Sequence, residues 1–426
     1  MRIIENMESE VRGYVRSFPV IFEKSKKWYL YDEQGNEYLD FFAGAGTLNY
    51  GHNNEEIKTV MIDYLQNDGV LHGLDMATKA KTTFLQKFSD TILSPRNLEY
   101  KVQFTGPTGT NAVETALKLA RMVKGRSNVV AFTNGFHGLT QGSLSVTGNA
   151  FYRDEAHISR CNVSFMPYDG YFGPDVNTMD YFRRFLSDAS SGLDLPSAVI
   201  VETIQAEGGV NVASAAWLKE LEQICREFDI LLIIDEIQVG NGRSGDFFSF
   251  EEAGVTPDMI TLSKSIGGGL PLALLLMRPE LDQWQPGEHT GTFRGNNLAF
   301  VASTKAMEYW ENNDLSESVK YKSKVMETEL NNVVKKYADS LEMRVRGRGM
   351  IWGIAINELG FAGELSKRCF EKGLVIELAG AEDQVLKFLP PLVIDEESLK
   401  KGIAIVDEAM GELLKEKEGK LKGAFV

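Results

Sequence analysis

The sequence has few cysteines and little proline, and these shortages exclude several kinds of protein. Its 426 residues include 3 cysteines, 12 prolines and 40 glycines. The proline and glycine content is too low for a collagenous or low-complexity chain. Cys161, Cys225 and Cys369 are odd in number and far apart, so they predict neither a disulfide framework nor a zinc site, and we expect no bound metal. This cysteine usage fits a reducing cytoplasm.

Long apolar runs and an excess of positive charge are also missing. The most apolar stretches, 230–234 and 270–277, are far shorter than the roughly 20 residues that span a bilayer, and acidic residues interrupt the first ten positions. We therefore expect no membrane anchor and no export signal. Lys and Arg number 45 against 60 Asp and Glu, a net charge of -15 that disfavours a nucleic-acid-binding surface.

What the sequence does contain is an alternation of short apolar runs with amphipathic segments. A chain of this length suggests two or three domains of about 150 residues each. Four runs, 129–132, 163–166, 198–201 and 230–234, are apolar on both faces and predict buried parallel strands. Between two of them, Ser214 precedes apolar residues at helical spacing, which predicts a crossing helix. This order indicates a doubly wound α/β layer whose ligands gather at the carboxyl ends of the strands.

The pattern changes near both ends of the chain. Residues 28–40 alternate aromatic and polar positions around a turn, as a hairpin does. After about residue 300, Glu and Lys become dense and helical spacing dominates up to Val345, followed by a short α+β pattern through residue 392. We interpret this C-terminal part as a second, smaller domain.

Two segments predict anion and ring binding. Residues 105–111 form a glycine-rich turn with hydroxyls before a helical stretch, and free N–H groups and the helix dipole favour a phosphate there. This segment contains neither GxGxxG nor GxxxxGK[ST], so it does not predict a dinucleotide site or a P-loop. Phe136 follows the run 129–132 and offers an aromatic face to a planar cofactor. Taken alone, the first is an ordinary capped helix and the second a core residue.

Two charged residues also follow apolar runs. Asp235 comes directly after the run 230–234, where a carboxylate is costly to bury unless it meets a cation or several donors, such as a protonated pyridine nitrogen. A metal or a loop cap would use it equally well. Lys264 stands between two serines, and at the mouth of a sheet its pKa can fall so that it attacks a carbonyl. By itself it could be a surface lysine near a turn.

Taken together, these segments resemble the class III, or ω-amino acid, aminotransferases, which use pyridoxal 5'-phosphate (PLP). The similarity covers nearly the whole chain, and the segments that carry it are 38–41, 51–52, 116–121, 136–138, 235–238, 263–264 and 291–293. It implies the type I fold of PLP-dependent transferases, with a mainly parallel seven-stranded sheet in a large domain and a smaller α+β domain built from both termini. The expected division is 1–55, 56–300 and 301–426, with the first and last parts forming the small domain.

The resemblance also implies the contacts of the cofactor ring. Lys264 would bind the cofactor aldehyde covalently, Asp235 would pair with the pyridinium nitrogen, and Gln238 would approach the ring hydroxyl. Phe136 would cover the ring, with His137 also in the cofactor site. Lys264 and Asp235 would be the catalytic residues.

The phosphate contacts imply more than one subunit. Gly109 and Thr110 would donate to the phosphate of their own subunit's cofactor, and Thr292 would reach the phosphate of the neighbouring subunit. The protein is therefore expected to form at least a homodimer, with a tetramer or hexamer as larger possibilities.

A narrower set of segments, 41–46, 72–78, 106–111 and 166–172, is similar to the branch of the family that makes 2,4-diaminobutyrate in ectoine biosynthesis. This implies glutamate as amino donor and aspartate 4-semialdehyde as acceptor. Gly44, Glu207 and Lys387 are the candidate substrate contacts. Glu207 matches a position that masks an arginine in relatives, but Lys387 stands where that arginine is usual, and Leu139 replaces a second one.

Three alternatives share parts of this pattern. An ornithine-type or 4-aminobutyrate-type class III aminotransferase would differ in substrate only. A PLP aminomutase or racemase on the same fold would retain the amine and need no 2-oxoglutarate. A noncatalytic α/β binding protein would need no reactive lysine, and it would be colourless when purified.

Overall fold

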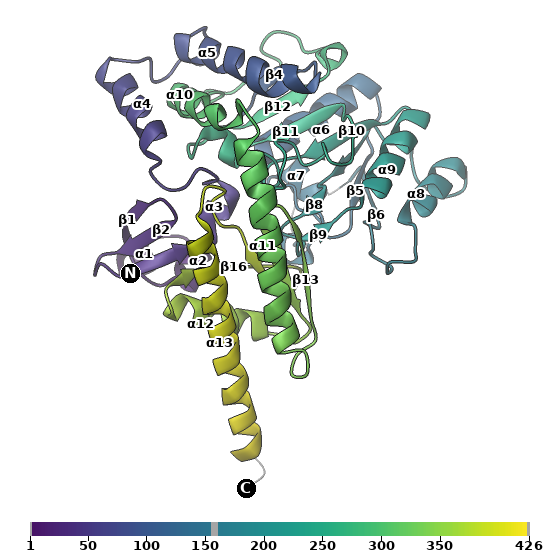
Figure 1. The fold of residues 1–426 in the computed structure, drawn as a ribbon. Helices are drawn as coiled ribbons and strands as arrows, with labels where there is room; N and C mark the ends of the chain where they lie inside the picture. The colour runs from purple at the N-terminus through teal and green to yellow at the C-terminus, as the bar shows by residue number, and fades with distance from the viewer. Residues whose placement is uncertain (1, 155–160, 424–426) are drawn as a thin grey trace.

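The computed structural model describes residues 2–154 and 161–423, which are built around a seven-stranded sheet (Figure 1). Its strand order is β4 (Lys101–Phe104), β12 (Leu274–Met277), β11 (Met259–Leu262), β10 (Leu231–Asp235), β7 (Ala198–Val201), β5 (Val129–Phe132) and β6 (Val163–Met166). Only β12 runs antiparallel to its neighbours. The predicted mainly parallel sheet is therefore confirmed, and the four predicted runs are β5, β6, β7 and β10.

The sheet is covered on both faces, which explains why its strands are apolar throughout. Alternate strand residues enter different cores: Val130 and Phe132 pack into one cluster, whereas Val129 and Ala131 pack with α6 (Gly109–Lys124) in another. The predicted crossing helix is α9 (Ala215–Glu227), and the Ser214 hydroxyl accepts a hydrogen bond from the Trp217 amide at its start.

A second, antiparallel sheet follows in the C-terminal part. Its strand order is β13 (Met343–Arg348), β14 (Ile351–Ile356), β17 (Val385–Phe388) and β16 (Glu377–Ala379), and the helices of this part are α11 (Asp314–Lys336), α12 (Phe361–Glu371) and α13 (Glu396–Gly423). The prediction of helix up to Val345 is wrong at its end. Residues from Met343 pair with β14 instead, because that pairing satisfies their backbone groups in a sheet.

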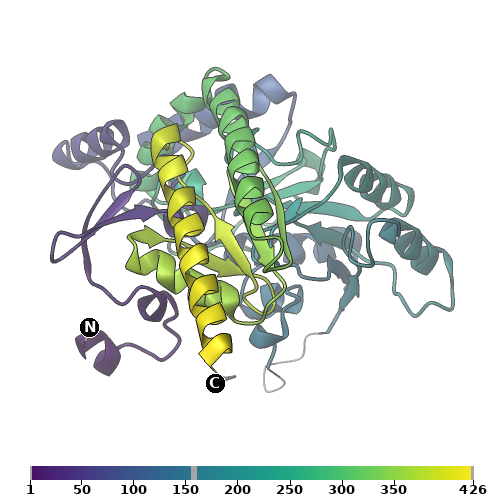
Figure 2. The same ribbon diagram turned by 60° about the horizontal axis from the view of Figure 1, so that its bottom comes forward.

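The N-terminal part is joined to the C-terminal part by strand pairing. The predicted hairpin is β2 (Tyr29–Asp32) and β3 (Glu37–Asp40), preceded by β1 (Phe22–Lys26). β3 also pairs in parallel with β15 (Leu374–Val375), where Leu39 lies opposite Leu374. Figures 1 and 2 show the N-terminal strands beside the C-terminal helices and away from the large sheet. This arrangement agrees with a small domain made from 1–55 and 301–426, and the division itself stays a prediction.

The remaining elements are short or lie at the periphery. They are α1 (Arg2–Met7), α2 (Tyr14–Ser17), α3 (Ala43–Gly46), α4 (Glu55–Gln66), α5 (Lys79–Phe88), α7 (Gln141–Ser145), α8 (Thr178–Ser187), α10 (Asn297–Ala306), β8 (Ile204–Gln205), β9 (Asn211–Val212), and the single-turn segments η1 (Ser89–Leu93), η2 (Ser94–Arg96), η3 (Ala150–Tyr152), η4 (Lys264–Gly267), η5 (Pro279–Leu281) and η6 (Met307–Trp310). Among the residues that the structure describes, no helix is both long and apolar enough to cross a membrane.

Candidate active site

Asp235 is the last residue of β10 and lies at the carboxyl end of the sheet, buried on all sides. Its Oδ1 accepts hydrogen bonds from the Thr261 hydroxyl and the Ile237 amide, each at 3.1 Å. Its Oδ2 lies 2.7 Å from His137 Nδ1. A carboxylate offers about four acceptor positions, so three donors leave room for one more. Asp235 can therefore accept a further N–H from a ligand.

The contact with Asp235 favours the protonated form of His137. Burial alone would lower the pKa of His137, but the hydrogen bond and charge of Asp235 and the charge of Glu202 outweigh it and raise the pKa. Glu202 is itself buried, accepts a hydrogen bond from the Phe136 amide at 2.9 Å, and has its pKa raised by burial to about 7. Asp235 and His137 thus form an ion pair behind the site. The structure places the His137 imidazole against Asp235, and its predicted cofactor role stays a prediction.

Lys264 follows β11 at the start of η4, in a backbone conformation that side chains seldom adopt. Its φ is 53°, in the left-handed region, which usually costs a non-glycine residue of order 1 kcal/mol. Within the described part of the chain, its Nζ has no hydrogen bond and no ion pair. Burial lowers its pKa, against the opposing charge of Glu207. A half-buried amine with a lowered pKa, on a strained backbone, is suited to attack a carbonyl.

The first turn of α6 faces the same region and is open to an anion. Thr108 occupies the N-cap position, but no side chain caps the helix. Gly138, with φ 120°, brings its loop so close that a Cβ there would lie 2.5 Å from the Thr110 hydroxyl oxygen. The Thr110 and Thr140 hydroxyls are 2.7 Å apart. The free amides of the turn that begins at Gly109, the helix dipole and these hydroxyls make a site for a phosphate.

The predicted substrate residues also meet. Lys387 Nζ lies 2.7 Å from Glu207 Oε1, and Gln238 Nε2 donates to the same oxygen at 3.0 Å. The Gln238 amide also donates to the Ala45 carbonyl at 2.9 Å. That carbonyl belongs to α3, where residues 43–46 all have positive φ, including 59° at Gly44. The segment with Gly44 is therefore a left-handed turn beside Gln238, and the roles of these residues stay predictions.

Phe136 lies on a cavity that Glu207 also lines, whereas Thr292 lies on a loop outside it. Phe136 is half-buried, its ring is 5.6 Å from that of Tyr152, and both line a cavity of about 640 Å³. Thr292 is exposed on the loop before α10. The single chain does not bring it to Lys264 or α6, and its predicted role would need a second subunit.

Sequence reasoning missed two residues of the site. Glu377 on β16 lies 3.1 Å from Lys387 Nζ, and the hydroxyl of Tyr14, on α2, donates to the other Glu377 oxygen at 3.2 Å. Nothing local in the sequence marks either one, because strand pairing and chain folding alone bring residues 14, 377 and 387 together.

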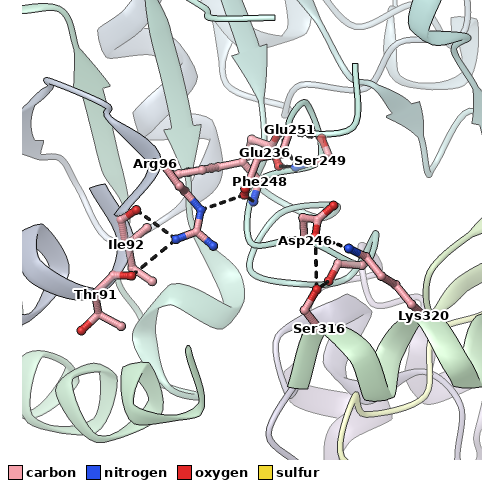
Figure 3. A network of polar contacts seen from close by, with 11 residues as sticks. Thr91, Ile92, Arg96, Glu236, Asp246, Phe248, Ser249, Glu251, Ser316 and Lys320 are labelled. Atoms are coloured by element: carbon pink, nitrogen blue, oxygen red, sulfur yellow. Dashed lines mark hydrogen bonds and ion pairs between the residues drawn. The ribbon is translucent and has the colours of Figure 1, made fainter. Parts of the chain in front are cut away.

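A network of polar contacts holds the loop 236–251, which follows Asp235 (Figure 3). The Ser249 amide and hydroxyl donate to the buried Glu236 carboxylate, and Arg96 donates to Glu251 at 2.9 Å. On the other side, Lys320 of α11 lies 2.6 Å from Asp246. These contacts anchor the loop to both parts of the molecule. In the described residues, no three His, Cys, Asp or Glu side chains come together as a metal site would need.

Comparisons with known proteins show which proteins this chain is similar to. A family model described as aminotransferase class-III matches residues 12–410. A diaminobutyrate–2-oxoglutarate transaminase from Wolinella succinogenes is 68% identical over 425 residues, covering 100% of this chain and 99% of the relative. One from Bordetella parapertussis is 56% identical, with 98% and 97% covered.

Solved structures share the fold at low sequence identity. An ornithine aminotransferase from Toxoplasma gondii has a TM-score of 0.83 at 23% identity, covering 98% of this chain and 94% of that one. An S-selective transaminase from Arthrobacter sp. has a TM-score of 0.85 at 22% identity, with 97% of each chain covered. Since the family model spans most of the sequence and close relatives match along its whole length, the chain belongs to the class III aminotransferase family.

Proposed function

We propose that this protein is a PLP-dependent transaminase that uses L-glutamate to aminate L-aspartate 4-semialdehyde, giving L-2,4-diaminobutyrate and 2-oxoglutarate. The observation that carries the chemistry is the meeting of Lys264, Asp235 and the open first turn of α6 at one edge of the sheet. The relative with 68% identity is named as a transaminase of diaminobutyrate and 2-oxoglutarate, and this name supports the proposed choice of substrates.

The residues present fit the cofactor. The uncapped first turn of α6 with Thr110 suits its phosphate, the remaining acceptor position on Asp235 suits its ring nitrogen, and the unpartnered Lys264 amine suits its aldehyde. When bound, PLP supplies an electron-withdrawing ring that stabilises negative charge on the adjoining substrate carbon.

The chain itself supplies the base that would transfer protons and the carboxylate that would pair with the ring nitrogen. Lys264 Nζ, whose pKa burial lowers, is the group that would take a proton from the substrate carbon and return it. The Asp235 carboxylate, which lies 2.7 Å from His137, would sit beside the ring nitrogen and favour its protonated form.

Two substrates of different charge must use one site. Glutamate brings a carboxylate near the reacting carbon, and Lys387 is the cation that can receive it once Glu207 moves aside. An ω-amine substrate brings no carboxylate there, so Glu207 can remain on Lys387. Lysine is a point charge without the bidentate fork of arginine, and we expect it to hold the carboxylate less rigidly.

The test is an assay of purified protein with glutamate and aspartate 4-semialdehyde, in which 2-oxoglutarate and diaminobutyrate are both measured. We expect the two products in equal amounts, whereas an isomerase would form no 2-oxoglutarate. Lys264→Ala should abolish turnover, and borohydride should no longer fix the cofactor to that variant. Substantial turnover by Lys264→Ala would contradict the proposal.

The finer assignments belong to the same proposal. A homodimer or larger assembly is supported by the exposed position of Thr292, where a second subunit can contact it. A cytoplasmic place in ectoine biosynthesis and salt adaptation is supported by the buried thiols of Cys225 and Cys369 and by the compound that the relatives are named for.

A further inference from the structure

Lys387 lies between two carboxylates that differ in their freedom to move. Its Nζ is 2.7 Å from Glu207 Oε1 and 3.1 Å from Glu377 Oε1, and the Lys387 side chain is fully buried. The Glu207 side chain is 30% exposed, whereas that of Glu377 is 3% exposed. Glu207 can therefore leave the lysine, and Glu377 cannot.

Glu377 is held in place by two elements. On the small sheet, Glu377 of β16 is directly opposite Lys387 of β17, so both side chains project from the same face. From the N-terminal part of the chain, the Tyr14 hydroxyl donates to Glu377 Oε2 at 3.2 Å. Each carboxylate oxygen of Glu377 thus faces a fixed partner.

The second carboxylate changes what happens when Glu207 leaves. A buried ammonium that loses its only counter-ion is strongly destabilised, because its charge is left uncompensated away from water. With Glu377 in place, the departure of Glu207 leaves a neutral pair instead, and the Gln238 amide oxygen, 3.4 Å from Nζ, adds a polar neighbour. The opened state is then accessible before the substrate carboxylate arrives.

We propose that Glu377 is the fixed counter-ion of Lys387, a positioning residue that allows Glu207 and the carboxylate of glutamate to exchange on that lysine. The proposal rests on the proposed function, because it assigns Glu377 to the glutamate half of the transamination. In the half that uses the ω-amine of diaminobutyrate, Glu207 stays on Lys387, so Glu377 has little effect there.

The test compares the two half-reactions of the holoenzyme in Glu377→Gln. Cofactor absorbance is followed after mixing with glutamate alone or with diaminobutyrate alone. The glutamine keeps an acceptor for Lys387 but removes the charge. We expect the rate constant with glutamate to fall at least about tenfold and that with diaminobutyrate to change less than about twofold.

Asp383→Asn is the matched control. Asp383 lines the same cavity, and its φ of 53° suits asparagine as well as aspartate. It makes no contact with Lys387 within the described residues, so both half-reactions should keep their wild-type rates. If Asp383→Asn also slows the glutamate half-reaction and spares the diaminobutyrate half-reaction, the cause is a general charge effect, and the proposal is overturned.

Equal loss in both half-reactions of Glu377→Gln, or no loss in either, would also overturn it. If that variant does not fold, Tyr14→Phe replaces it, because it releases one Glu377 oxygen and should slow the glutamate half about threefold while sparing the other. If Tyr14→Phe then changes both half-reactions equally, or neither of them, the proposal is contradicted.

A readout independent of turnover is the binding of glutarate, an unreactive dicarboxylate. Its association rate constant should fall about tenfold in Glu377→Gln, with a Kd within about threefold of wild type, because only the opened state has lost its counter-ion. An unchanged association rate would count against Glu377. A wild-type holoenzyme that does not react with glutamate would instead refute the proposed function.

Discussion

At the residue scale, Asp235 has two effects: it raises the pKa of His137, and it leaves one acceptor position for a ring nitrogen. The contact of 2.7 Å between them is buried, so the charge of each depends on the other. His137 belongs to the loop after β5 and Asp235 ends β10, so the pair links two segments that follow different strands.

We expect Asp235→Asn to lower the pKa of His137. Without the carboxylate, burial dominates and disfavours the protonated imidazole. In the wild type, a raised pKa means that the pair stabilises the fold below the usual histidine pKa of about 6.5, and this contribution is lost as pH rises through the raised value. NMR titration of the cofactor-free protein measures the change.

The other four of the five histidines serve as the control for this titration, because their signals should keep their pKa values. The holoenzyme of Asp235→Asn should also lose at least about a hundredfold in turnover, since the ring nitrogen loses its anionic partner. An unchanged His137 titration would show that the ion pair does not set its charge.

Residues at strand ends were predictable, whereas the partner of Lys387 was not. Asp235 and Lys264 each follow an apolar run, and parallel strands bring their carboxyl ends to one edge. Glu377 lies on a three-residue strand with an ordinary pattern. Only the register between β16 and β17 places it opposite Lys387. The spacing of residues within one strand does not predict its register with another strand.

At the element scale, the first turn of α6 is a candidate phosphate site because the loop that contains Gly138 comes close to it. Gly138 has φ 120°, and a side chain there would collide with Thr110. The predicted strands were recognisable because both faces are buried. The C-terminal boundary of α11 was not recognisable from the sequence, because the residues from Met343 belong to a sheet whose pairing local spacing does not show.

We expect Gly138→Ala to weaken cofactor binding about tenfold or more. The added methyl would lie 2.5 Å from the Thr110 hydroxyl oxygen, so Thr110 or the loop must move away from the phosphate position. Equilibrium dialysis of PLP measures the affinity. The control is Gly125→Ala, which has positive φ, 60°, at the end of the same helix but open space around it.

Gly125→Ala should cost about 1 kcal/mol of stability and leave PLP affinity unchanged. Equal losses of affinity in both variants would show that backbone strain, and not the contact with Thr110, is responsible.

At the scale of the whole molecule, both ends of the chain contribute to one site. Tyr14 comes from the N-terminal part, Lys387 from the C-terminal part and Lys264 from the large sheet. The fold class and the seven-stranded sheet followed from the sequence because apolar runs specify buried strands. How subunits meet did not follow, since an exposed residue such as Thr292 has no pattern that names its partner.

If Thr292 completes the phosphate site of a partner subunit, two inactive variants should restore each other. Thr292→Ala and Lys264→Ala subunits are each impaired in homodimers. A mixed dimer holds one intact site, with Lys264 from the first subunit and Thr292 from the second, and one site that lacks both. Random mixing should therefore recover roughly a quarter of wild-type activity, above the sum of the two variants measured separately. If Thr292 instead serves the cofactor of its own subunit, every site in the mixture retains one defect. Activity would then be the simple average of the two parents, and the proposed dimeric site would be wrong.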